Sequence, residues 1–227
     1  MKKILFVCSF VLCAVLFSSY QAMSGKPFEG VITFKITYPD NKISESQMAM
    51  YPKMLTVSIK GTKARTDMQL SGMNTVTITD YSDKTSVALV NLMGQKYAIK
   101  KTTADIEKEM EKEAKPTVVL SGETKVIAGY TCKKAVITLN DDGAVTTYEI
   151  YYTNELGSKM ANFDNPLYKD IDGVLLEFFL KNHDINMKFS ATSIEKKSLP
   201  AIDFEIPSDY PITTLDELKS KFGGGTE

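Results

Sequence analysis

Residues Phe28–Tyr38 read FEGVITFKITY, and the alternation in this stretch decides the fold class. After the glycine, every second residue is isoleucine, phenylalanine or tyrosine, and the residues between them are valine, threonine or lysine. A period of two, carried by β-branched and aromatic residues, is typical of a strand with one buried face. The sequence therefore predicts a β-strand here, with its large apolar side chains on one side.

The segments that follow repeat this pattern and are joined by short turns. Glycine or aspartate turns separate Met54–Ile59, Lys63–Leu70, Asn74–Tyr81, Thr85–Asn91 and Lys96–Lys100. Parallel strands need a crossover connection of a dozen residues or more, whereas short turns join antiparallel neighbours. This half of the chain is therefore expected to form an antiparallel meander.

A helix is expected at Thr103–Lys115 (TADIEKEMEKEAK), where Thr102 or Thr103 is the N-cap candidate and Pro116 ends the helix. It is interpreted as a surface helix laid across the sheet, and the alternative is a lid over the sheet's open side. Strands resume in the second half, at Lys125–Ala128, Thr131–Asn140, Val145–Thr153, Val174–Lys181 and Met187–Glu195, and a short helix is expected at Thr213–Phe222. The chain is thus predicted to be mainly β (α+β), with about ten strands and one to three covering helices.

The first residues indicate export. Lys2 and Lys3 precede an uncharged run from Ile4 to Phe17, and small or polar residues follow up to Ala22. A basic start, a short apolar stretch and a weakly polar exit is the pattern of a cleaved signal peptide. The domain prediction is a signal peptide at 1–22, a single antiparallel β domain at 23–212, and a short helix with a flexible tail at 213–227. A buried N-terminal helix is the alternative for the first segment.

The predicted location is the periplasm or outer envelope. A lipid anchor is disfavoured because Val7 and Leu12, rather than small residues, precede Cys8 and Cys13. Cleavage leaves Cys132 as the one cysteine of the mature chain, interpreted as a buried strand residue, with a reactive thiol as the alternative. Without Lys2 and Lys3 the chain has 25 basic and 28 acidic residues, so no basic field exists to hold nucleic acid.

Residues suited to catalysis are scarce. The one histidine, His183, lies in a turn between two expected strands, so no metal site, cofactor or histidine-dependent triad is predicted. A pair of carboxylates that performs acid–base catalysis is still an alternative. However, Asp141 and Asp142 fall in a turn, where solvated acids are expected. The chain is predicted not to be an enzyme, with a hydrolase using acids alone as a further hypothesis.

Several segments resemble an exported bacterial family of unknown function grouped with the lipoprotein-carrier (LolA/LolB-like) fold. They are FEGVITFKIT, IKGTKARTDM, GYTCKKAVI, YEIYYTNEL, DGVLLEF and FEIPSDY, and together they span about Phe28 to Tyr210. The resemblance implies a curved antiparallel sheet, a half-barrel, that encloses an apolar cavity. It also singles out Arg65, the one arginine, whose other interpretation is an outward strand residue paired to Asp67 or another acid.

The resulting functional prediction is a non-enzymatic envelope protein that holds a hydrophobic, lipid-like or acyl ligand under the sheet. Its mature part carries ten methionines, which suit loosely specified apolar ligands. The alternative is an envelope structural or interaction protein with a filled core and no small ligand. Expected ligand contacts are ten apolar residues, with Arg65 as a possible polar contact: Phe34, Ile36, Leu55, Met68, Val76, Val87, Leu89, Tyr151, Leu176 and Phe178.

Overall fold

The structure is a computed structural model that describes residues 27–39, 44–70, 73–92, 94–113, 115–141, 144–157, 159–182 and 185–222. The predicted leader over 1–22, with Cys8 and Cys13, lies outside these residues. So do His183, Asp142 and the predicted tail after residue 222.

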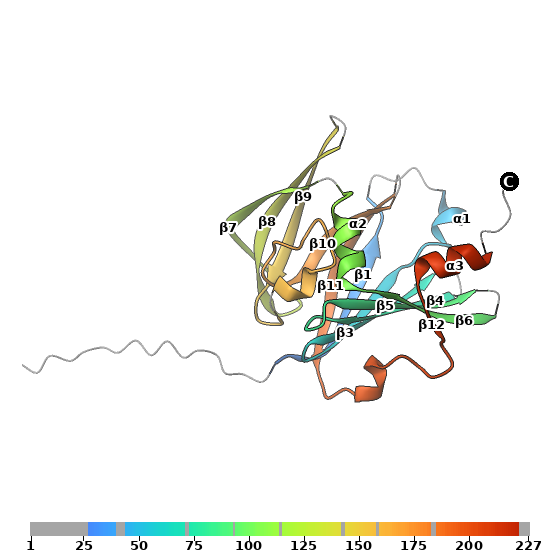
Figure 1. The fold of residues 1–227 in the computed structure, drawn as a ribbon. Coiled ribbons are helices and arrows are strands. Elements are labelled where there is room, and N and C mark those ends of the chain that lie inside the picture. Colours follow the sequence, from blue (N-terminus) through green and yellow to red (C-terminus); the bar gives the residue numbers. More distant parts are fainter. Residues whose placement is uncertain are drawn as a thin grey trace, which may run out of the picture.

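Twelve strands account for most of the described chain, and three short α-helices and two 3-10 turns lie between or after them (Figure 1). The strands are β1 (Glu29–Thr37), β2 (Met54–Lys60), β3 (Lys63–Leu70), β4 (Met73–Asp80), β5 (Thr85–Leu92), β6 (Gln95–Lys101), β7 (Thr117–Ile127), β8 (Tyr130–Asp141), β9 (Ala144–Thr153), β10 (Val174–Asn182), β11 (Ile185–Lys196) and β12 (Ile212–Thr213). The helical elements are α1 (Glu45–Met48), α2 (Thr103–Met110), α3 (Leu215–Phe222), η1 (Lys159–Asn162) and η2 (Ala201–Phe204).

All twelve strands form one open sheet, in the order β12-β6-β5-β4-β3-β2-β1-β11-β10-β9-β8-β7. The predicted mainly β fold with antiparallel pairing is confirmed, except that β12 pairs parallel to β6 and makes the sheet mixed. In Figure 1, strands β7 to β9 stand at a steep angle to strands β3 to β6, with β1, β11 and β10 between them. The sheet therefore bends along the order of its strands and does not close.

Two element boundaries differ from the prediction. Helix α2 ends at Met110 instead of Lys115, although its N-terminus has the expected cap, since Thr102 accepts from the backbone of Asp105. Strand β7 begins at Thr117, well before the predicted Lys125, because the apolar run from Val118 to Leu120 joins the same ladder.

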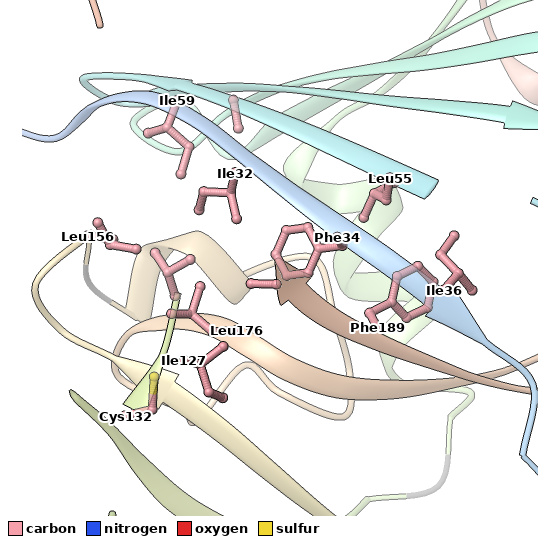
Figure 2. Packing of buried hydrophobic residues seen from close by; sticks show 13 residues of the cluster. Ile32, Phe34, Ile36, Leu55, Ile59, Ile127, Cys132, Leu156, Leu176 and Phe189 are labelled. Atoms are coloured by element: carbon pink, nitrogen blue, oxygen red, sulfur yellow. The ribbon is translucent and has the colours of Figure 1, made fainter. Parts of the chain in front are cut away.

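Side chains from both halves of the sheet form the main core. Ile32, Phe34 and Ile36 are each at most 4% exposed, and they pack with Leu176 of β10 and Phe189 of β11 (Figure 2). The alternation predicted for Phe28–Tyr38 is therefore confirmed, because every second residue of β1 lies in this core. A second cluster gathers around Tyr168 and Ile171 of the β9–β10 connection.

The C-terminal segment covers part of one sheet face. Ile206 and Tyr210 pack on a third apolar cluster formed by β4, β5 and β6. Arg65 of β3 anchors this segment by donating from Nη1 to the backbone oxygen of Asp203, at 3.1 Å. Because Arg65 lies opposite Ile78 in the β3–β4 register, this cluster and Arg65 share one face of the sheet. None of the helices in the described ranges is long and apolar enough to cross a membrane.

Candidate functional site

A row of mostly polar side chains crosses six neighbouring strands. Residues that lie directly opposite each other in a sheet project to the same face. The registers of β2, β1, β11, β10, β9 and β8 link such residues into one continuous line. We call this line the outer row, and its members are Met54, Lys35, Ser190, Glu177, Tyr151 and Lys134.

A β-bulge at Leu176 places Glu177 in this row. Leu175 lies opposite Tyr152, but the next pair is Glu177 with Tyr151, so Leu176 has no partner of its own on β9. Without the extra residue, Leu176 would lie opposite Tyr151, and Glu177 would project to the other face. The bulge therefore explains how a segment as apolar as VLLEFFLK presents a carboxylate on the polar side of the sheet.

A groove of about 650 Å³ opens over the β9–β11 end of the outer row. Side chains of β7, β9, β10 and β11, with Pro39 after β1, form its walls. The lining residues are Pro39, Lys125, Thr146, Thr147, Tyr148, Glu149, Tyr151, Glu177, Phe179, Asn186 and Lys188.

Glu177 is the electrostatic centre of the groove and is 8% exposed. Lys125 Nζ lies 3.1 Å from both of its carboxylate oxygens, and Lys188 Nζ lies 3.2 Å from Oε1. Ser190 adds a hydrogen bond from Oγ to Oε2 at 3.3 Å. Burial raises the pKa of Glu177, but the hydrogen bonds from the two lysines lower it by more, so the pKa lies below its ordinary value. The carboxylate is therefore ionised at neutral pH.

Aromatic rings lie beneath the two lysines that pair with this carboxylate. Lys125 Nζ lies 4.9 Å from the ring centroid of Tyr151, and Lys188 Nζ lies 5.6 Å from that of Phe179, both within cation–π range. Tyr148 stacks on Phe179 with the ring centroids 5.3 Å apart. The phenolic oxygen of Tyr148 is buried and has no hydrogen-bond partner within the described part of the chain.

This arrangement suits a polar ligand that also has apolar faces. The rings offer flat apolar contact, while the lysines and Glu177 offer charged donors and acceptors at fixed positions. The lining contains two lysines, Lys125 and Lys188, and two glutamates, Glu149 and Glu177, so its formal charges balance. The site does not therefore select for a strongly charged ligand.

Of the ten apolar residues expected to contact a ligand, the structure places only Tyr151 in this groove. Seven lie in or against the main core, Tyr151 itself among them: Phe34, Ile36, Leu55, Met68, Tyr151, Leu176 and Phe178. Three lie in the separate cluster under the C-terminal segment: Val76, Val87 and Leu89. The predicted residues therefore fall in two cores rather than around one pocket.

An apolar cavity does exist, but it lies elsewhere. Its volume is about 240 Å³, and it lies at the β2–β3 turn and the start of β10. None of the ten predicted residues is among its lining residues, which are Ile59, Gly61, Thr62, Tyr81, Ser82, Leu156, Gly157, Ala161 and Val174.

Arg65 and Cys132 lie outside the groove, and their contacts are with the rest of the fold. Arg65 makes a bidentate pair with Asp67, with Nε and Nη2 at 2.8 and 2.9 Å from the carboxylate oxygens, as one interpretation of the sequence expected. Cys132 is fully buried, and burial raises the pKa of its thiol to about 11. The thiol is therefore protonated at neutral pH, which fits the buried rather than the reactive interpretation.

Sequence reasoning missed every groove residue except Tyr151, including the charged residues Lys125, Glu177 and Lys188. One signal was visible, because Glu177 is the only acid within the apolar segment VLLEFFLK. A charge inside an apolar strand needs a partner, since an unpaired buried charge is costly. The partners themselves, on β7 and β11, follow only from the strand order.

A family model described as "N-glycanase peptide, N-terminal domain" matches residues 34–219. No curated protein matches the chain. The match covers most of the chain, so the resemblance to lipoprotein carriers is wrong. The predicted function, a carrier of a hydrophobic or acyl ligand, is wrong with it, and the alternative structural role in the envelope has no better support.

Proposed function

The chain belongs to the family of N-glycanase peptide N-terminal domains, and from this premise we propose that it is a non-catalytic accessory domain that binds N-linked glycans in the groove. The observation that carries the proposal is the position of Glu177. It is an ionised carboxylate paired with two lysines, and these lysines lie over the rings of Tyr151 and Phe179. The family description names an N-glycanase, which makes a glycan the ligand class to consider first.

The chemistry of the groove supports a sugar ligand. A pyranose ring has hydroxyl groups around its edge and C–H groups on its faces. Aromatic side chains pack against the C–H faces, while carboxylates, ammonium groups and threonine hydroxyls bond to the edge. The groove contains both kinds of group, and its volume of about 650 Å³ is within the usual range for ligand sites. The buried hydroxyl of Tyr148 is a further group that such a ligand would satisfy.

The ionisation state of Glu177 supports ligand binding rather than general acid catalysis. A general acid at neutral pH needs a carboxyl group whose pKa is raised toward the working pH. The lysine contacts instead hold the pKa of Glu177 below its ordinary value. Glu177 therefore acts as a hydrogen-bond acceptor in this proposal, and the predicted export would bring the domain to glycans outside the cytoplasm.

Replacing Tyr151 with alanine is expected to weaken binding of a released N-glycan by about tenfold or more. The change removes the ring at the centre of the groove, and stacking contacts of this kind contribute about 1 kcal/mol beyond the area they bury. Isothermal titration calorimetry of the unmodified and variant domains, with the same glycan preparation, measures the difference.

Tyr130→Ala is the matched control. Tyr130 also lies below a lysine, with Lys196 Nζ 5.9 Å from its ring centroid, but it does not line the groove. Tyr130→Ala should bind as the unmodified domain does, and so should Tyr151→Phe, which keeps the ring. Circular dichroism confirms that each variant is folded. The proposal fails if the unmodified domain binds no N-glycan at millimolar concentration, or if Tyr130→Ala and Tyr151→Ala weaken binding equally.

A further inference from the structure

We propose that a second hollow on the same sheet face is a second subsite for the same glycan, so that the domain takes an extended oligosaccharide lying across β4 to β9. This inference rests on the proposed function. It goes beyond it by naming the size of the ligand and the residues that bind its far end.

The second hollow has a volume of about 450 Å³ and lies over β2, β3 and β4. Like the groove, it combines one aromatic ring with several polar side chains. Its lining residues are Ala49, Tyr51, Lys53, Met54, Thr56, Asp67, Gln69 and Asn74.

The outer row places both hollows on one face. Met54 is the row member that lines the second hollow, while Glu177 and Tyr151 line the groove. Between Met54 and Glu177 the row contains only Lys35 of β1 and Ser190 of β11. Lys35 is exposed and Ser190 is half-buried, so the surface that joins the two hollows is polar and open.

The side chains of the second hollow suit sugar hydroxyls. Gln69 and Asn74 lie opposite each other on β3 and β4, and both are exposed. Each amide offers a donor and an acceptor, the pattern that a hydroxyl group needs. Asp67 is held in place by the bidentate contact with Arg65, so its carboxylate is a preorganised acceptor. Tyr51 packs at 5.5 Å against Tyr38, which fixes the position of its ring.

Described residues on either side of the β1–β2 connection line the two hollows. Pro39 lines the groove, and Tyr51 and Lys53 line the second hollow. Tyr38, next to Pro39, contacts the Tyr51 ring and donates from its hydroxyl to the backbone oxygen of Pro52. A contact next to Pro39 therefore links the linings of the two hollows.

The open strip has a definite length. Its two ends, Asn74 on β4 and Tyr151 on β9, are six strand spacings apart, or about 29 Å along the bent sheet at about 4.8 Å each. Beyond Asn74 the same face is covered, since Ile206 and Tyr210 pack on the apolar cluster of β4, β5 and β6. A ligand that fills the strip is therefore an oligosaccharide of several residues, and a disaccharide reaches only one hollow.

The test compares an intact N-glycan with its core disaccharide of two N-acetylglucosamine residues. The unmodified domain is expected to bind the intact glycan at least about tenfold more tightly than the disaccharide. The double variant Gln69→Ala/Asn74→Ala should lose most of that difference while its affinity for the disaccharide is unchanged. Asn91→Ala, which changes an exposed asparagine of β5 outside both hollows, is the matched control and should behave as the unmodified domain.

The outcomes separate the two proposals. If the disaccharide and the intact glycan bind equally and the double variant changes neither affinity, the second subsite is wrong and the groove alone remains. If the unmodified domain binds neither sugar, the proposed function itself is wrong. If the double variant weakens the disaccharide as much as the intact glycan, the second hollow is not a separate subsite.

Discussion

Replacing Phe189 with alanine should lower the free energy of unfolding by roughly 3–5 kcal/mol, the usual cost of truncating a buried phenylalanine. Phe189 is 3% exposed in the main core, and its ring stacks on Phe178 with the centroids 4.8 Å apart and the planes within 5°. The substitution removes both the buried area and the ring contact, and the neighbouring strands β1 and β10 can relax only partly into the space. Urea denaturation followed by circular dichroism measures the change.

The matched control is Val126→Ala, on the edge strand β7. Val126 is 70% exposed, so its substitution should change the unfolding free energy by no more than about 0.5 kcal/mol. A loss below about 1 kcal/mol for Phe189→Ala would mean that the interior under the sheet is loosely filled, as a carrier of apolar ligands would require. A loss in the expected range means that this interior is a packed core.

Gly30→Ala is the second substitution with a large expected effect, and we expect a loss of about 2–3 kcal/mol or failure to fold. A Cβ atom at Gly30 would lie 2.2 Å from the backbone oxygen of Glu195 and 2.8 Å from the Phe28 ring. The oxygen belongs to β11, so only separation of β1 from β11 relieves the clash. This pair joins the two halves of the sheet, and the measurement is again the unfolding free energy.

Gly122→Ala provides the contrast. A Cβ atom there meets nothing within 4 Å, and Gly122 lies on the edge strand β7. Its substitution should be neutral or slightly stabilising, because alanine restricts the unfolded chain more than glycine does. Equal losses for the two glycine variants would contradict the strand register of β1 and β11.

The strands were predictable where one face is buried and the other exposed. Phe28–Tyr38 and the hairpin of β2 and β3 gave clear signals, and Gly61 adopts a φ of +61° at the turn between them. Strand β7 was found only in part, because it lies at the edge and most of its side chains are exposed. Alternation carries no information when neither face of a strand is buried.

The site was less predictable than the fold, because it depends on a bulge and on strand order. The sequence predicts Tyr151 as an apolar contact, yet it lies in a groove that also contains Glu177 and two lysines. The position of Glu177 depends on the single extra residue at Leu176, which shifts the register of β10. Pairing with Lys125 and Lys188 requires that β7 and β11 both lie close to β10, and nothing local in the sequence shows this.

The resemblance to lipoprotein carriers failed for a related reason. Its motifs were strand-and-turn patterns, which many bent antiparallel sheets share. Such patterns identify a fold class correctly, but they do not show whether the interior is hollow. Here the residues expected to line a cavity are core residues, of which Ile36, Leu55 and Leu89 are each at most 8% exposed.

The most direct test of the glycan-binding account is an NMR titration of the labelled domain with a released N-glycan. We expect the resonances of Tyr151, Glu177 and Phe179 to shift in a saturable way, while those of Ile59 and Leu156 in the apolar cavity stay in place. Shifts confined to the apolar cavity, or no shifts at a saturating glycan concentration, would contradict the account.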